Sequence, residues 1–120
     1  MRRYDGKYNK GKSYKFALRI VNLHKYLVET KKEFVLSKQI LRSGTSIGAN
    51  VEEAIGGQTK KDFCHKIFLA YKEARETHYW IRLLRDSNYI DIRMYESILP
   101  ECDEIIKITG KIISTSRKSL

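Results

Sequence analysis

The segment that most constrains the fold spans residues 42–55, where two glycines stand inside an apolar pattern of helical period. On a wheel of about 100° per residue, Gly44 and Gly48 share one face with the isoleucines and the valine of the segment. A glycine in a helix interior costs roughly 1 kcal/mol relative to alanine, so two glycines on a core face need an offsetting gain. We expect that gain to be the close approach of a neighbouring helix. The alternative is a break or loop at the glycines, but the apolar period passes through both without losing phase.

Small polar residues follow one edge of this apolar face. Carboxylates inside a helical bundle need polar partners, because burying an unpaired charge is costly. We therefore predict a polar network that holds this segment in register with the following helix. A catalytic role for the same carboxylates is the alternative. The predicted network consists of Arg42, Ser43, Ser46, Asn50, Glu53, Glu73 and Glu76.

The rest of the chain continues the helical pattern. Its 120 residues fit one domain, which is large enough to bury a core without disulfides or a metal. Amphipathic segments follow one another with short polar connections, and no segment has the alternation of a strand. The sequence therefore predicts an all-α fold, an antiparallel up-down four-helix bundle. The expected helix caps are Ser13, Ser37, Thr59 and Asp91.

The two ends of the chain and its single proline interrupt this pattern. Residues 1–12 contain two glycines and no apolar period, so we expect a flexible basic arm there. We expect the bundle to occupy residues 13–115 and a frayed tail to occupy residues 116–120. Pro100 falls inside the apolar pattern of the last helix and either kinks that helix or begins a new one. We favour the kink, because the apolar phase continues across the proline.

The composition is that of a soluble, charge-rich helical protein, with 42% hydrophobic and 32% charged residues. No apolar run approaches the roughly 18 residues that a membrane span needs, and the basic N-terminal segment has no apolar stretch typical of a secretion signal. We therefore expect a cytoplasmic location and no membrane partner. In that compartment, Cys64 and Cys102 are expected to be reduced and mostly buried thiols rather than a disulfide.

Residue patterns for metal or nucleotide chemistry are missing from the sequence. It has no Glu-x-x-His pair of the kind that di-iron bundles use, and His24, His65 and His78 have no ligand-like spacing. The glycine-containing stretch at residues 44–48 lacks the lysine of a phosphate loop and follows no strand. No pattern indicates a nucleophilic site. We therefore expect no catalytic residues, no metal, no cofactor and no enzymatic activity.

Basic residues give the chain a formal net charge of +10. A basic surface attracts polyanions through its long-range potential and through counterion release. On one helix face within residues 60–86, basic residues accompany Phe68 and Tyr79, and such rings can stack on unpaired bases. The alternative is a solvated charged face that keeps the protein soluble. The predicted nucleic-acid-binding residues are Arg2, Arg3, Lys7, Lys10, Lys12, Lys15, Lys61, Lys72, Arg75, Tyr79 and Arg82.

Another stripe of the helix at residues 60–86 is apolar enough to need a further packing partner. A helix that is apolar around most of its circumference usually packs against more than one neighbour. We expect this stripe to contact another subunit, although the same residues could equally lie inside the bundle core. The candidate residues of the oligomer interface are Leu69, Trp80 and Leu83.

Residues 37–54, SKQILRSGTSIGANVEEA, closely resemble the signature of the four-helix-bundle proteins that are encoded in intervening sequences of bacterial 23S ribosomal RNA genes. The resemblance covers roughly residues 14–113. Pro100 and the basic first 15 residues depart from the family pattern. Further residues that look like the family's third helix are Phe63, Ala74, Glu76, Thr77, Trp80, Leu83 and Leu84, which precede an Asn-Tyr-Ile turn.

The resemblance implies a compact bundle that assembles into a homopentamer, and it implies no known activity. A related protein is the accessory variability determinant of diversity-generating retroelements, which is thought to bind nucleic acid and a reverse transcriptase. Two functions stay open. The first is a non-enzymatic RNA-binding oligomer. The second is an oligomeric adaptor whose main partner is a protein, for example as an accessory subunit of a nucleic-acid enzyme.

Overall fold

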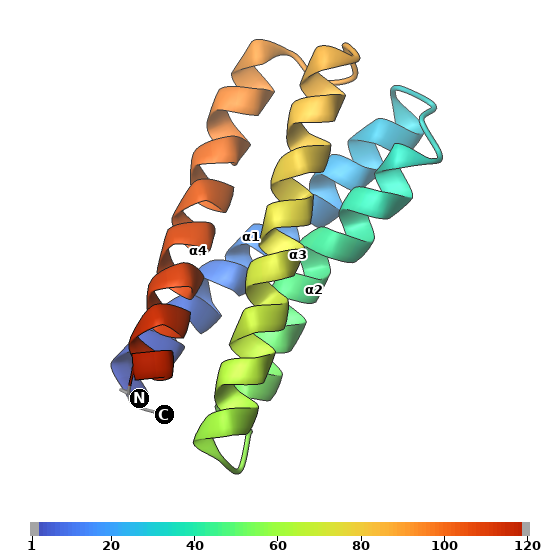
Figure 1. Ribbon diagram of the computed structural model, residues 1–120. Helices are drawn as coiled ribbons and strands as arrows, with labels where there is room; N and C mark the ends of the chain where they lie inside the picture. The colour runs from blue at the N-terminus through green and yellow to red at the C-terminus, as the bar shows by residue number, and fades with distance from the viewer. Residues whose placement is uncertain (1–2, 119–120) are drawn as a thin grey trace.

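The computed structural model describes the backbone of residues 3–118 and the side chains of residues 11–117. Helices α1 and α4 begin and end, respectively, at the same end of the molecule (Figure 1). Each helix packs against the next one along the chain, and α4 closes the bundle against α1. The predicted all-α four-helix bundle is confirmed, with no strand in the described part of the chain. The helices are α1 (Arg3–Glu29), α2 (Leu36–Ile55), α3 (Lys60–Asp86) and α4 (Ile92–Lys118).

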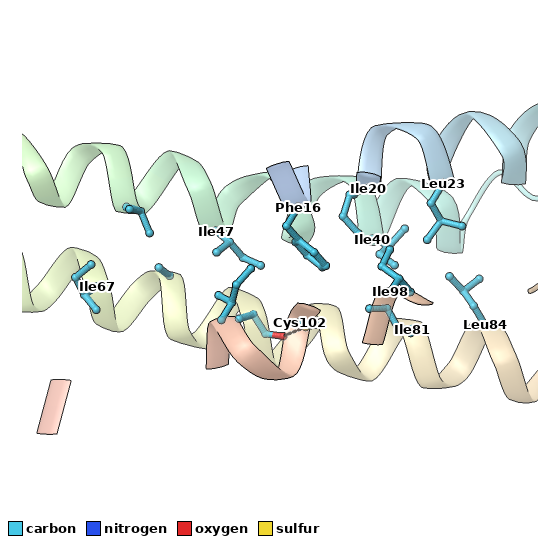
Figure 2. Close-up of a cluster of buried hydrophobic side chains, with 14 of the residues drawn as sticks. Phe16, Ile20, Leu23, Ile40, Ile47, Ile67, Ile81, Leu84, Ile98 and Cys102 are labelled. Atoms are coloured by element: carbon cyan, nitrogen blue, oxygen red, sulfur yellow. Dashed lines mark hydrogen bonds between the residues drawn. The ribbon is translucent and has the colours of Figure 1, made fainter. Parts of the chain in front are cut away.

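Apolar side chains from all four helices meet along the bundle axis (Figure 2). Phe16 and Ile20 of α1 and Ile47 of α2 are fully buried, as is Ile81 of α3. Burying each such side chain contributes roughly 1.5–3 kcal/mol. The apolar stripes predicted from helical spacing therefore form the core. On α4, Ile98 and Ile105 also lie in the core.

The two glycines of α2 lie inside a continuous helix, so the alternative of a loop at these positions is excluded. Both face α1. A Cβ built on Gly44 would lie 2.7 Å from Cγ1 and Cγ2 of Ile20, which is too close for real atoms. A Cβ on Gly48 would meet the backbone oxygen of Ser13 at 3.4 Å, an ordinary contact. The expected close approach of a neighbouring helix is therefore present, and Gly44 is the position that requires it.

The start of α2 is capped by Glu33 and not by Ser37 as the sequence suggested. The Glu33 carboxylate accepts hydrogen bonds from three backbone N–H groups, those of Val35 at 3.2 Å, Leu36 at 3.0 Å and Ser37 at 2.7 Å. Burial raises the pKa of Glu33, but these hydrogen bonds outweigh it and hold the pKa below its ordinary value of 4.5. Ser37 lies inside the first turn, where its hydroxyl donates to the Glu33 carbonyl.

The other two predicted caps at internal helix starts are confirmed. The Thr59 hydroxyl accepts from the N–H of Asp62 at 3.0 Å, at the N-terminus of α3. The Asp91 carboxylate accepts from the N–H of Met94 at 2.9 Å, just before α4. Each side chain satisfies one of the N–H groups that a helix start leaves without an intrahelical partner.

The first helix begins ten residues earlier than the sequence indicated, so the predicted boundary at Ser13 is corrected. Backbone residues 3–12, expected to form an arm, belong to α1. Ser13 is 1% exposed and faces Gly48 inside the bundle, a place where it cannot cap a helix. The Lys12 ammonium is 2.6 Å from the Glu104 carboxylate of α4, and this contact favours continuation of α1.

The C-terminal boundary is corrected in the same direction. The predicted frayed tail at residues 116–120 is helical as far as Lys118, the last described residue. Ser116 is 1% exposed, and the Arg117 guanidinium lies 5.6 Å from the centre of the Phe68 ring on α3. Contacts with the bundle therefore hold this segment, because its helical register places one face against α3. Residues 119–120 lie outside the described residues.

Pro100 lies inside α4, which runs through it as one helix, so the alternative of a new helix at the proline is excluded. A proline removes one N–H donor and disturbs the turn before it. Arg19 of α1 contacts that turn. Its guanidinium donates to the Ser97 carbonyl at 3.0 Å and to the Ser97 hydroxyl at 2.8 Å, and it also pairs with Glu101. The carbonyl that loses its helical donor is that of Glu96, four residues before the proline, and Arg19 donates to the next carbonyl along, that of Ser97. The kink stays a prediction.

Both cysteines are free thiols, as expected. Cys102 is fully buried and donates to the Ala74 carbonyl of α3 at 3.3 Å, whereas Cys64 is half-buried. Burial raises the pKa of Cys102 to about 12, with a smaller contribution from the charge of Asp103. Separately, every helix within the described residues is too polar or too short to cross a lipid bilayer.

Candidate nucleic-acid interface

Cations on the exposed side of α3 lie over aromatic rings of the same helix. Lys72 Nζ is 5.7 Å from the centre of the Phe68 ring, and the Arg75 guanidinium is 5.9 Å from that of Tyr71. Residues four apart on a helix share a face, which accounts for both pairs. Arg75 also donates to the Tyr71 hydroxyl at 3.5 Å. The sequence had singled out three of these four residues as a basic and aromatic stripe, and the structure gathers them on one surface.

The stripe continues toward the C-terminal end of α3. The Arg82 guanidinium is 5.9 Å from the centre of the Tyr79 ring, and the Tyr79 side chain is 50% exposed. The Tyr79 and Trp80 rings meet edge to face, with centres 5.0 Å apart. Tyr79 is therefore an aromatic surface open to solvent beside a cation.

The cations of this stripe differ from the arginines that join neighbouring helices in what they contact. Within the described residues, Lys72, Arg75 and Arg82 form no ion pair with a carboxylate, and each lies over an aromatic ring. The hydrogen bond from Arg85 lowers the pKa of the exposed Asp86, and the charge of Arg82 adds a smaller effect in the same direction. Arg19 of α1 and Arg42 of α2, by contrast, are both paired with glutamates. The charge of the α3 stripe is therefore available to an external anion.

Helix α4 forms the opposite wall of a groove along this stripe. Arg117 of α4 reaches over the Phe68 ring, and the Tyr71 ring lies against Gly110, where a Cβ would be 3.4 Å from Cε1 of the ring. A hollow of about 440 Å³ opens between these groups. Its lining consists of Phe68, Tyr71, Gly110, Ile113, Ser114 and Arg117.

Sequence reasoning missed Tyr71, Gly110 and Arg117 as functional candidates. Tyr71 lies in neither of the two stripes predicted for residues 60–86, and Arg117 falls within the predicted frayed tail. The one available signal was Gly110, a helix-interior glycine in the apolar pattern of the last helix. Its meaning depends on the pairing of α3 with α4, which a single helical wheel does not give.

A second hollow continues the groove along α3 and α4. In it His78 Nε2 is 2.9 Å from Asp103 Oδ1, so the acid of this stretch already has a partner. Arg75 contributes to this hollow and also contacts Tyr71 of the first one, so the two hollows adjoin. The lining of the second hollow is Arg75, His78, Arg82, Asp103 and Ile106.

The remaining predicted nucleic-acid contacts are spread over other surfaces. Lys15 on α1 and Lys61 in the first turn of α3 are exposed. Lys12 is half-buried and paired with Glu104, so it is less available than the sequence suggested. Three more residues lie on the α1 backbone with side chains outside the described part of the structure: Arg3, Lys7 and Lys10. Arg2 lies outside the described residues.

The structure brings together part of the predicted polar network. The Arg42 guanidinium pairs with Glu76 and lies 3.3 Å from a Glu73 oxygen, which joins α2 to α3. Trp80 Nε1 donates to Glu76 at 2.9 Å. Burial raises the pKa of Glu76, but the hydrogen bonds from Trp80 and Arg42 outweigh it and lower the pKa below its ordinary value. The Glu76 hydrogen bond in turn raises the pKa of Arg42.

The small polar residues of the predicted network make contacts of two kinds. Thr77 of α3 donates to the Ser43 hydroxyl of α2 at 2.8 Å, and both side chains are fully buried. Ser46 donates to the Arg42 carbonyl at 2.6 Å and Asn50 to the Ser46 carbonyl at 2.9 Å, both within α2. Only the first of these three contacts joins two helices.

Glu53 does not join the group around Arg42, which corrects that part of the predicted network. It pairs with Lys66 at 2.7 Å on the exposed surface between α2 and α3. The eleven residues from Arg42 to Glu53 correspond to about 16 Å along a helix at 1.5 Å per residue. Since α3 runs antiparallel to α2, the two ends of the stripe meet different turns of α3.

The three candidate residues of the oligomer interface are all half-buried on α3. Trp80 packs against the bundle core through its ring. Leu69 and Leu83 lie outside the core cluster. The alternative that Leu69 and Leu83 are core residues is therefore not favoured. Each leucine keeps part of its apolar side chain exposed to solvent.

Histidine, cysteine and carboxylate side chains do not gather into a metal-binding group. Within the described residues, no three of them are placed so that they could hold one metal ion. In the groove, two side chains of these types, His78 and Asp103, contact each other.

Comparison with known proteins gave a family and a solved relative. A family model described as 23S rRNA-intervening sequence protein matches residues 10–111. A crystal structure of a protein with unknown function from the S23 ribosomal protein family of Bacteroides thetaiotaomicron is 53% identical, with a TM-score of 0.89. The match covers 92% of the present chain and 98% of that one. No match was found among curated proteins.

Proposed function

The chain belongs to the family of 23S rRNA-intervening sequence proteins, and from this premise we propose that it is a non-enzymatic, oligomeric RNA-binding protein of the cytoplasm. The observation that carries the proposal is the set of cations on the α3 and α4 face that lie over aromatic rings and, among the described residues, form no ion pair with a carboxylate. These cations are Lys72, Arg75, Arg82 and Arg117.

Cations of this kind suit a phosphate backbone. Each cation that neutralises a phosphate releases a condensed counterion, and this release supplies much of the free energy of binding at low salt. An arginine already paired with a carboxylate, such as Arg42, would first have to give up that partner. The net charge of +10 adds a long-range attraction that steers a polyanion toward the protein.

Oligomerisation is the second part of the proposal. We expect copies to meet through the face of α3 that carries Trp80 and the partly open apolar surface of Leu69 and Leu83, and the family resemblance implies five copies. Assembly would repeat the basic face around a ring, so that one RNA could engage several copies at once. Linked sites raise overall affinity without any new type of contact.

The test of RNA binding is a titration of labelled structured rRNA fragments, unrelated RNA and duplex DNA at several salt concentrations. We expect log affinity to fall linearly with log salt, since each neutralised phosphate contributes about 0.7–0.9 to the slope. Replacing Lys72, Arg75, Arg82 and Arg117 together by alanine should reduce the slope by about 3. No RNA binding by the unaltered protein at about 50 mM salt would overturn the proposal.

A matched control removes the same charge from another surface. The control variant replaces four lysines outside the groove by alanine: Lys25, Lys31, Lys32 and Lys38. We expect it to keep most of the salt dependence, whereas an equal loss in both variants would mean that only net charge matters. Salt-insensitive capture of one specific protein, without RNA binding, would favour the adaptor function instead.

Assembly is tested separately by the mass of the protein in solution. Light scattering of the unaltered protein should give about five times the mass of one chain. Replacing Leu69 and Leu83 by lysine should lower that mass to the monomer, while the helical content is unchanged. A monomeric unaltered protein would remove the oligomeric part of the proposal and leave RNA binding to be judged on its own titration.

A further inference from the structure

The groove between α3 and α4 has a chemistry that phosphate binding alone does not need. Beside its cations it presents two aromatic rings and a glycine, at Phe68, Tyr71 and Gly110. We infer that this cleft seats an unpaired base of the bound RNA, while the neighbouring arginines hold its phosphates. The inference rests on the proposed RNA-binding function. It adds that the protein recognises a nucleotide whose base is unpaired.

The floor of the cleft is open because residue 110 is glycine. The Tyr71 ring lies next to Gly110 of α4. A Cβ added to Gly110 would be 3.4 Å from Cε1 of that ring. Any larger side chain at position 110 would project past its Cβ into the hollow. A glycine in a helix interior costs roughly 1 kcal/mol relative to alanine, and here no packed neighbour requires it, since 3.4 Å is an ordinary contact. The unfilled space at the base of the cleft is therefore the gain that offsets the cost of this glycine.

The walls of the cleft are suited to stacking. Phe68 and Tyr71 are half-buried, so each ring is fixed by the bundle on one side and reaches solvent on the other. Unpaired bases stack on such rings and on arginine guanidinium planes, and every base has a face that can do so. Arg117 and Lys72 lie over Phe68 at 5.6 and 5.7 Å, at the weak outer limit of a cation–π contact. Both side chains can therefore shift to admit a base.

The cations are placed to hold the phosphates that flank such a base. Arg117 stands at one end of the hollow, and Arg75, hydrogen-bonded to the Tyr71 hydroxyl, stands toward the second hollow. Arg82 lies further along the same groove. From Tyr71 to His78 the groove advances about 10 Å along α3 at 1.5 Å per residue, which leaves room for the adjoining backbone.

Other occupants fit the cleft less well. An apolar peptide would gain nothing from the surrounding cations, and no carboxylate among the described residues lines the hollow beside the rings to receive a basic one. A free phosphate would use the cations and leave the rings unused. In a duplex the base faces are already stacked, and they are not available to Phe68 and Tyr71.

The test compares oligouridine with an abasic ribose-phosphate oligomer of the same length and charge. The unaltered protein should bind oligouridine roughly 5- to 150-fold more tightly, the range expected for one stacked base. Gly110→Leu fills the floor of the cleft without changing charge and should abolish that difference. The matched control is Gly11→Leu on α1, where nothing lies within 4 Å of the added Cβ, and it should keep the difference.

The outcomes separate this inference from the proposed function. If neither oligomer binds the unaltered protein at about 50 mM salt, RNA binding itself fails and the cleft has no occupant of this kind. If both oligomers bind equally with a steep salt dependence, RNA binding stands and the base-binding cleft is refuted. Tighter binding of oligodeoxyuridine than of oligouridine would assign the cleft to DNA and overturn the inference as stated. The abasic comparison needs no variant, so a folding defect in Gly110→Leu would not leave the question open.

Discussion

Two helix-interior glycines of this bundle, Gly44 and Gly110, stand in opposite surroundings. Gly44 of α2 is buried, and Ile20 of α1 occupies the space that a side chain there would need, with Cγ atoms 2.7 Å from the position of a Cβ. Gly110 of α4 is half-buried and faces a hollow, with only the Tyr71 ring at 3.4 Å. The first glycine allows two helices to pack closely, and the second leaves the space between two helices unfilled.

This difference divides the molecule into a structural half and a surface suited to binding. The α1–α2 pair contains the tight contact at Gly44 and the buried cap at Glu33, and Arg42 joins it to α3 through glutamates. The α3–α4 pair includes Lys72 and Arg117, which lie over the Phe68 ring and, among the described residues, form no ion pair with a carboxylate. Stability and binding can therefore be perturbed separately, which the following substitutions exploit.

The largest effect is expected from the same substitution made at both glycines. Gly44→Leu must displace Ile20 from a closed contact, and we expect it to lower the free energy of unfolding by about 3 kcal/mol or more. Gly110→Leu enters an open hollow and should cost little. Urea denaturation of both variants measures the comparison. Equal losses at the two positions would show that the α3–α4 groove is as tightly packed as the α1–α2 contact.

An intermediate effect is expected from replacing the residues that cap α2 and α4. Glu33→Gln, at the buried start of α2, should lower the free energy of unfolding by about 1–2 kcal/mol at pH 7, because it weakens charge-assisted hydrogen bonds to three N–H groups. Asp91→Asn, at the exposed start of α4, should cost less, since an amide oxygen is also a good cap. Thermal or urea unfolding of the two variants gives the ranking.

The pH dependence of the Glu33 variant checks the same assignment. The folded protein holds the pKa of Glu33 below its ordinary value of 4.5, so the stabilisation is complete above about pH 4.5 and is lost as the pH falls through the folded pKa. The difference between the unaltered protein and Glu33→Gln should therefore shrink on acidification. A difference that stays constant from about pH 7 down to about pH 3 would show that the carboxylate charge is not what caps α2.

The smallest effect is expected from alanine at the glycines that have ordinary contacts. Gly110→Ala and Gly48→Ala each place a Cβ at 3.4 Å from the nearest atom, so helix propensity should dominate and raise the free energy of unfolding by up to about 1 kcal/mol. Gly44→Ala is the matched control and should show no such gain. A loss at Gly48 as large as that at Gly44 would mean that the whole α1–α2 seam, and not one position, requires glycine.

Helical period and cap chemistry were sufficient to predict most of the fold. The predicted apolar face of α2, which contains Ile47, lies in the core, and Thr59 and Asp91 cap their helices as predicted. The apolar period of the sequence could not locate the start of α1. The contact that accompanies the longer helix joins Lys12 to Glu104, which is far along the chain. Glu33 was overlooked as a cap because its carboxylate reaches N–H groups up to four residues ahead, outside the usual cap pattern.

The candidate interface was predicted only in part, for a physical reason. Lys72, Arg75 and Arg82 follow from the spacing within one helix, whereas the groove depends on which turn of α4 lies opposite which turn of α3. Tyr71 and Gly110 acquire a role only through that pairing. The polar stripe of α2 shows the same limit, since Glu53 shares its face with Arg42 and meets a different partner, Lys66.

The buried thiol of Cys102 gives the bundle an internal chemical reporter. Alkylating reagents and oxidants react with the thiolate, and a sulfur with a pKa of about 12 that lies against the Ala74 carbonyl offers almost none at neutral pH. The half-buried Cys64 is covered less completely. Because Cys102 is fully buried in the core, its modification requires the bundle to open around it, so its labelling rate follows how often the helices that bury it come apart.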